Sequence, residues 1–118
     1  MDHIDTLKQT TWYHNEVGSV AENIHERVCQ IIFAMAGHEV HGVRNSELAE
    51  ALSVSRPTIS RDLATLQKIG VVEEIPGLQG RWRLGPKLIQ ISRAHSEGMM
   101  RIKNAVSEID QRYSRTPL

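Results

Sequence analysis

The stretch Asn45–Gly70, NSELAEALSVSRPTISRDLATLQKIG, decides the fold of this 118-residue chain. It predicts two helices and a tight turn, because each half carries apolar residues at helical spacing on one face. Residues 53–55 leave room only for a turn, and Ser55 suits the N-cap of a second helix that has Pro57 in its first turn. Gly70 predicts the left-handed stop of that helix. The apolar positions are Leu48, Ala49, Leu52, Ile59, Leu63 and Leu66.

The outward face of the second helix carries polar side chains that favour DNA binding. They gather at its N-terminal end, where a recognition helix presents side chains to base edges in the major groove. Arginine can donate two hydrogen bonds to guanine, and small hydroxyls can reach bases or phosphates. An ordinary solvated pair of helices would show the same pattern, so this motif needs support from its context. The candidate DNA-binding residues here are Arg56, Thr58, Ser60 and Arg61.

Composition narrows the class of protein. The length fits one domain, and 40% hydrophobic residues fit a folded chain. No apolar run is long enough to span a membrane, and the acidic, polar N-terminus is unlike a signal peptide, so a cytoplasmic location without a membrane partner is expected. The formal charge is zero overall, but it is −5 in residues 1–52, +4 in residues 53–93 and +1 in residues 94–118. The positive block coincides with the predicted recognition helix, which favours a surface for phosphate.

The segment before the helix-turn-helix predicts a scaffold helix. Residues 1–18 show poor periodicity and are expected to form an N-terminal arm. Ser19 and Glu22 have the spacing of a capping box, and the apolar positions that follow recur with helical period until Gly37 ends the helix. Cys29 lies among these apolar positions, so it is expected to pack and not to react.

Few residues in the N-terminal half of the sequence suggest catalytic or metal chemistry. His38 and His41 lie in a connector that is expected to contain a short strand within Val40–Val43, and two histidines without further ligands make a poor metal site. His25 lies four residues before Cys29, but burial in a helix argues against a reactive pair. No phosphate-binding glycine loop occurs either. We therefore expect no enzymatic activity, no metal and no cofactor.

Residues 71–84 have the pattern of two short strands separated by turn-forming residues. The resulting β-hairpin would place Arg81 and Arg83 on the face opposite Trp82 and Leu84. A hairpin after a recognition helix is the wing of a winged helix, and its arginines would contact phosphates or the minor groove. An exposed basic hairpin without DNA contacts is the alternative.

A last helix is expected from Lys87 to about Tyr113. Its apolar positions alternate by three and four residues, which is the heptad pattern of a coiled coil. Gly98 weakens the first half, and a bend or break is expected near it. The stripe could pack on its own domain, but self-association into a homodimer is favoured because a winged helix needs no extra helix of this length. The candidate dimerisation residues are Met99, Ile102, Val106, Ile109 and Tyr113.

The motif Ser55-Arg56-Pro57-Thr58-Ile59-Ser60-Arg61 and the ending Arg81-Trp82-Arg83-Leu84-Gly85-Pro86 resemble the DNA-binding domain of IclR-family transcription regulators. Residues 60–63 are also similar to DeoR-type regulators, which often have an Asp after the Arg. The resemblance implies a winged helix that binds operator DNA as a dimer or higher oligomer. IclR-type proteins normally continue into an effector-binding domain, which these 118 residues do not include, so no small-molecule effector is implied. The family also tends to have a small hydroxyl residue where Pro57 stands.

The sequence thus predicts a mainly α fold with a small β-hairpin wing. Its parts are an arm (1–18), a winged helix-turn-helix domain (19–86) and a long C-terminal helix (87–118) that is expected to form the dimer. The predicted function is sequence-specific binding to double-stranded DNA by a transcriptional regulator that acts as a dimer on an operator-like site. A winged-helix module that binds proteins without reading DNA is the alternative.

Overall fold

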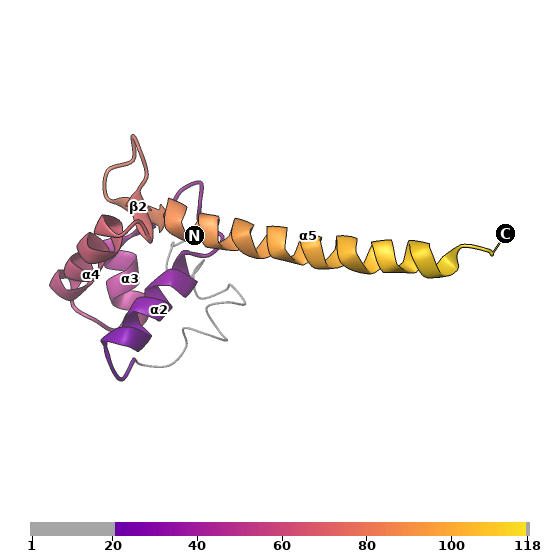
Figure 1. Cartoon of the computed structure of the whole chain (residues 1–118). Coiled ribbons are helices and arrows are strands. Elements are labelled where there is room, and N and C mark those ends of the chain that lie inside the picture. The colour runs from indigo at the N-terminus through magenta and orange to yellow at the C-terminus, as the bar shows by residue number, and fades with distance from the viewer. Residues whose placement is uncertain (1–20, 118) are drawn as a thin grey trace.

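A computed structural model describes residues 21–117, and the predicted arm (1–18) lies outside them. The fold is mainly helical, with a small antiparallel sheet and one long helix that leaves the rest of the molecule (Figure 1). The helices are α2 (Ile24–Met35), α3 (Asn45–Leu52), α4 (Arg56–Lys68) and α5 (Pro86–Ser114). The strands are β1 (Val43–Arg44), β2 (Val72–Glu74) and β3 (Arg81–Leu84), in the sheet order β1-β3-β2.

The start of α2 differs from the predicted capping box. Ser19 is not among the described residues, and α2 begins at Ile24 with Asn23 as its N-cap. The Asn23 side chain accepts a hydrogen bond of 3.0 Å from the backbone N–H of Glu26, and the Glu26 carboxylate accepts one of 2.8 Å from the N–H of Glu22. Asn is as good an N-cap as Ser, so a second capping signal four residues later sets the boundary.

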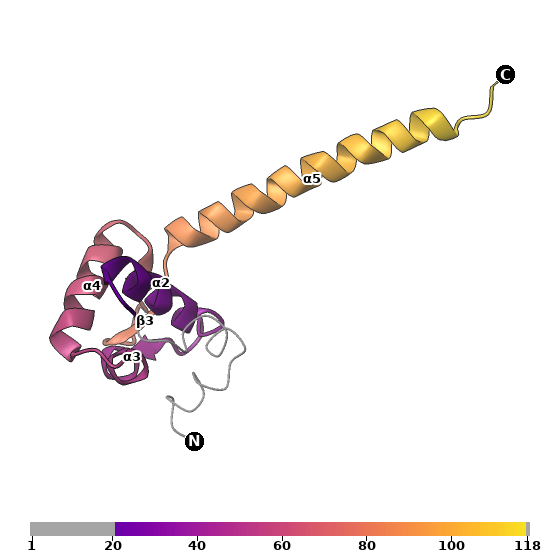
Figure 2. The same ribbon diagram turned by 90° about the horizontal axis from the view of Figure 1, so that it is seen from below.

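The helix-turn-helix forms as predicted. Ser53 takes the left-handed conformation at φ 57°, and the N–H of Val54 donates to the carbonyl of Ala49 at 2.9 Å, which closes the turn. The Ser55 hydroxyl caps α4, and Gly70 at φ 85° follows its end. Figure 2 shows α2, α3 and α4 grouped at one end of the molecule. Their buried apolar side chains, joined by two from the strands, make the core: Ile31, Ala34, Met35, Val43, Leu48, Ala49, Leu52, Ile59, Leu63, Leu66 and Val72.

The sheet has one strand more than the predicted hairpin. β2 and β3 pair antiparallel, with Val72 opposite Leu84 and Glu73 opposite Arg83. β1 adds to the other edge of β3, but it covers Val43–Arg44, and Val40 lies outside it with 75% of its surface exposed. The expected strand within Val40–Val43 was therefore placed too early. β1 cannot continue beyond Arg44 because α3 begins at the next residue, Asn45.

The end of β3 is fastened to the corner between α4 and β2. The N–H of Gly85 donates to the carbonyl of Val71 at 2.8 Å, and the N–H of Lys87 donates to the carbonyl of Gly70 at 3.1 Å. A Cβ on Gly85 would lie 2.4 Å from the carbonyl oxygen of Gly70, so only glycine allows this approach. These contacts hold the first turn of α5 against the domain.

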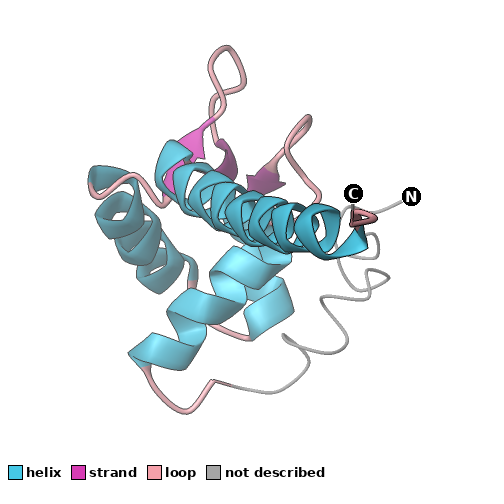
Figure 3. Ribbon diagram, turned by 45° about the vertical axis from the view of Figure 1, so that its right-hand side comes forward, coloured by secondary structure: helices cyan, strands magenta, loops and turns pink. Residues whose placement is uncertain are grey.

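Beyond its first turns, α5 projects away from the domain (Figures 1 and 2), and Figure 3 shows the same helix coming forward, unbroken, in front of the domain. The principal extents of the molecule, 72 × 31 × 28 Å, reflect this shape. The predicted bend near Gly98 does not occur, because a glycine in an exposed helix costs only about 1 kcal/mol and breaks no backbone hydrogen bond. No residue of α5 is fully buried. None of the helices described in residues 21–117 is both long and apolar enough to cross a membrane.

Candidate nucleic-acid interface

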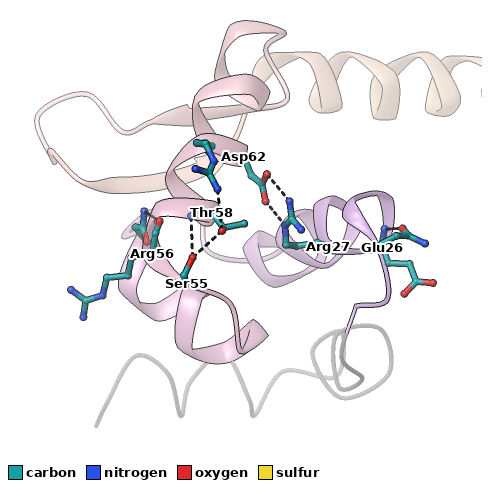
Figure 4. Close-up of polar contacts among 9 residues, drawn as sticks. Glu26, Arg27, Ser55, Arg56, Thr58 and Asp62 are labelled. Carbon is teal, nitrogen blue, oxygen red and sulfur yellow. Dashed lines mark hydrogen bonds and ion pairs between the residues drawn. The ribbon is translucent and has the colours of Figure 1, made fainter.

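The N-terminal half of α4 presents two arginines to solvent. Arg56 and Arg61 are both exposed, and Figure 4 shows the Arg56 guanidinium directed away from the rest of the domain. Arg61 Nη2 lies 3.4 Å from the Thr58 hydroxyl oxygen, a long contact that leaves its other donors free for a ligand. Two guanidinium groups about one and a half turns apart on this helix can each present a pair of donors to a guanine or a phosphate.

The two hydroxyl residues predicted on the same face are already engaged within the domain. The Thr58 hydroxyl lies 2.8 Å from that of the N-cap Ser55 (Figure 4). The Ser60 hydroxyl accepts a short hydrogen bond from Asn45 Nδ2, which also donates to the Arg56 carbonyl at 3.3 Å. Thr58 and Ser60 therefore lie beside the exposed arginines, but their hydroxyls hold the start of α4 in place.

The wing arginines have different surroundings. Arg83 Nε forms an ion pair of 2.7 Å with Glu73, its cross-strand neighbour, and Nη1 donates to the carbonyl of Glu39 at 3.4 Å. Arg81 donates to the carbonyl of His41 at 3.2 Å and has no carboxylate within ion-pair distance among residues 21–117. As predicted, the alternate side chains on β3 pack toward the core, namely Trp82 and Leu84. Of the two arginines, Arg81 is therefore the one with charge available to an anion.

Sequence reasoning missed a third basic residue beside the wing. Arg44 in β1 lies directly opposite Arg81 in β3, so the two side chains project from the same face of the sheet. Arg44 is exposed. Like charges directly opposite each other are unfavourable unless an anion lies between or near them. The sequence did not predict a role for Arg44, because Arg44 lies in the acidic segment of residues 1–52 and only strand pairing places it beside Arg81.

A buried ion pair between α2 and α4 holds α4 in its orientation. Arg27 Nε and Nη2 donate to the two carboxylate oxygens of Asp62, at 2.6 and 3.1 Å (Figure 4). The Asp62 side chain is only 7% exposed. The pKa of Arg27 is raised above its ordinary value, mainly by the hydrogen bond with Asp62. Burial lowers this pKa, and the attraction between the two charges raises it. Because Asp62 follows Arg61 directly, this contact fixes the direction in which Arg61 points.

Residues 31–85 match the protein-family model HTH_11, described as an HTH domain. The chain contains a helix-turn-helix domain. The matched HTH domain runs from the middle of α2 through α3, α4 and the three strands. The match carries no assignment to the IclR family and points to no catalytic family. No curated protein matches the chain.

The remaining candidate residues of the described chain do not form a second site. Cys29 is exposed on α2, which corrects the expectation that it packs in the core, and His25 is exposed as well. The buried face of α2 instead carries Ile31, Ala34 and Met35. Within residues 21–117, no three His, Cys, Asp or Glu side chains lie close enough together to hold a metal ion.

Proposed function

We propose that this protein is a sequence-specific DNA-binding transcriptional regulator that acts as a dimer on an operator-like site. The observation that carries the proposal is the pair of exposed arginines at the N-terminal end of α4, Arg56 and Arg61. In a helix-turn-helix this end of the second helix enters the major groove. Since Thr58 and Ser60 are engaged within the domain, base reading falls mainly on the two arginines, while the hydroxyls remain close enough to contact phosphates.

The wing supplies phosphate contacts in this proposal. Arg81 and Arg44 project from one face of the sheet, and their guanidinium groups form no ion pair with a carboxylate among the described residues. Arg83 contributes less, because its guanidinium is paired with Glu73 and would have to give up that contact to reach DNA. The role of these residues is to raise affinity for all duplexes and to fix the register of α4, since phosphate contacts carry no sequence information.

The proposed dimer forms through α5, with residues 87–118 as its dimerisation segment and residues 19–86 as the DNA-binding domain. The five predicted contact residues are exposed on α5. Two winged-helix domains would then place their recognition helices in successive major grooves, about 34 Å apart. Within this proposal we also retain the IclR-type likeness, which rests on the sequence from Arg81 through Pro86 at the end of the wing.

The test is selection of bound duplexes from a random pool by the purified protein at low and moderate salt, followed by anisotropy measurements on the enriched sequence. An inverted repeat that is bound with a steep salt dependence supports the proposal. The matched controls are Arg61→Gln, which removes a predicted base contact, and Arg93→Gln, which removes an equal charge from α5. Absence of binding to any duplex at low salt would refute the function.

The second candidate is a protein-binding module built on the same fold. It is favoured by the internal engagement of Thr58, Ser60 and Arg83, which leaves fewer free side chains for DNA than the sequence suggested. A stable self-association that persists at high salt, together with no DNA affinity at low salt, would select this alternative.

A further inference from the structure

The apolar stripe of α5 has no partner within the described chain. Leu88, at the start of this stripe, is half-buried. The residues of the stripe that follow it, called the seam below, are exposed to solvent. The exposed fractions reach 58% at Ile102 and 80% at Tyr113. A stripe of this kind on a projecting helix, apolar from Met99 to Tyr113, marks an interaction surface. Its positions, with alternating spacings of three and four residues, are Ser92, His95, Met99, Ile102, Val106, Ile109 and Tyr113.

This face has the shape that receives a side chain from a second helix. A shallow, open hollow lies on α5, lined by Arg101 and Ala105 together with His95, Gly98, Met99 and Ile102. In a coiled coil each apolar knob inserts between four residues of the facing helix, and the last four of these lining residues stand at the d, g, a and d positions that form such a hole. Gly98 adds room because it has no side chain. The occupant that fits a three-four seam is another helix with the same seam.

We infer that two copies of α5 pair side by side, parallel and in register, so that both winged-helix domains lie at the same end of the dimer. This inference rests on the proposed dimer and adds its orientation. In the parallel arrangement each seam residue meets its own copy. The polar residues Ser92 and His95 then form two layers next to the domains. The layers beyond them are entirely apolar or aromatic: Met99, Ile102, Val106, Ile109 and Tyr113.

The antiparallel arrangements fit less well. Full overlap would set Ser92 against Ile109 and His95 against Val106, so that polar groups face apolar ones in four layers. A shorter overlap that sets Lys103 against Asp110 would gain two ion pairs, but it would exclude Met99 from the seam. Moreover, α5 has 29 residues and is therefore about 43 Å long, so antiparallel pairing separates the domains by at least the length of the helix. Only parallel pairing brings both domains to one end, where adjacent half-sites are within reach.

Cysteine cross-linking tests the orientation. In a Cys29→Ser background, which removes the one native thiol, Val106→Cys is expected to give a covalent dimer for most of the protein in a glutathione redox buffer. Asn104→Cys, on the outer side of the same turn, is the matched control and is expected to stay monomeric on a non-reducing gel. Equal cross-linking of both variants would mean random collision and would overturn the inference.

A mixture of Val106→Cys chains with tagged Ile109→Cys chains distinguishes parallel pairing from the short antiparallel overlap, in which Val106 of one chain would face Ile109 of the other. Parallel pairing is expected to give mainly the two homodimers, whereas the short antiparallel overlap gives mainly the mixed product. A predominant mixed product would overturn the parallel orientation but leave the proposed dimer standing. If neither variant cross-links and sedimentation finds only monomers, the dimer in the proposed function fails as well. DNA binding by the wild-type chain is measured separately, so its outcome stays independent of both.

Discussion

The ion pair between Arg27 and Asp62 gives the sharpest test of how α4 is held against α2. In Arg27→Met, the Asp62 carboxylate, 7% exposed, loses both of its guanidinium donors. Removal of one partner of a buried pair costs about 3–5 kcal/mol. Since the Arg27 side chain is itself 20% exposed and water can reach the site, we expect a loss near the lower end, about 3 kcal/mol. For a domain of this size that lowers Tm by about 12–24 °C.

Urea and thermal unfolding followed by circular dichroism measure the effect, at one fixed protein concentration because any dimer makes Tm depend on it. The double variant Arg27→Met/Asp62→Leu removes both charges and is expected to recover much of the loss, which gives a coupling free energy of about 2 kcal/mol or more. The Arg83–Glu73 pair, with side chains 32% and 33% exposed, is the matched control and is expected to couple by at most about 1 kcal/mol. A coupling for Arg27 and Asp62 no larger than that of the exposed pair would refute the reasoning.

Four further outcomes are expected from the contacts described above. Arg61→Gln should cost about 1–3 kcal/mol at one base position of the selected site and little elsewhere, as measured by anisotropy on point-substituted duplexes. Arg44→Gln should weaken binding to all duplexes alike and lower the dependence of log K on log salt concentration by about one. Arg83→Gln should change that slope less, because the Arg83 guanidinium is already paired with Glu73. Ser55→Ala should cost about 1 kcal/mol in urea unfolding through loss of the α4 cap. Gly85→Ala should destabilise by about 1–3 kcal/mol through its clash with the Gly70 carbonyl, and an unchanged unfolding midpoint would contradict that geometry.

The sequence predicted the helix-turn-helix because local signals and tertiary packing agree there. The apolar positions of Asn45–Gly70 share one face on each helix, and the capping Ser55 and stopping Gly70 mark the ends of α4 by their own backbone preferences. The prediction was wrong at the start of α2, which begins at Ile24 with Asn23 as its cap. Gly98 was given too much weight, since one weak helix former does not interrupt a helix with good formers on both sides.

The parts of the candidate site that could not be predicted depend on contacts between distant residues. Asp62 reads as an ordinary surface charge on the recognition helix, and only its position opposite Arg27, 35 residues earlier, makes it buried and structural. Arg44 and Arg81 come together through strand register, and β1 is too short to give a periodic signal. The pairing of Arg83 with Glu73 follows from the register between β2 and β3. Charge counts along the sequence cannot separate a paired arginine from a free one.

These contacts also change which residues of α4 are expected to set specificity. For the Ser60 hydroxyl to accept a hydrogen bond from a base it would have to share or lose the one from Asn45, and a typical net hydrogen bond is worth about 1 kcal/mol. If the Thr58 hydroxyl contacted a base, it would similarly disturb its contact with Ser55, the N-cap of α4. Arg56 faces no such cost, since it is exposed and its guanidinium points away from the domain (Figure 4). Discrimination between operators should therefore come from the arginines, and substitution of Ser60 should act mainly on the stability of the contact between α3 and α4.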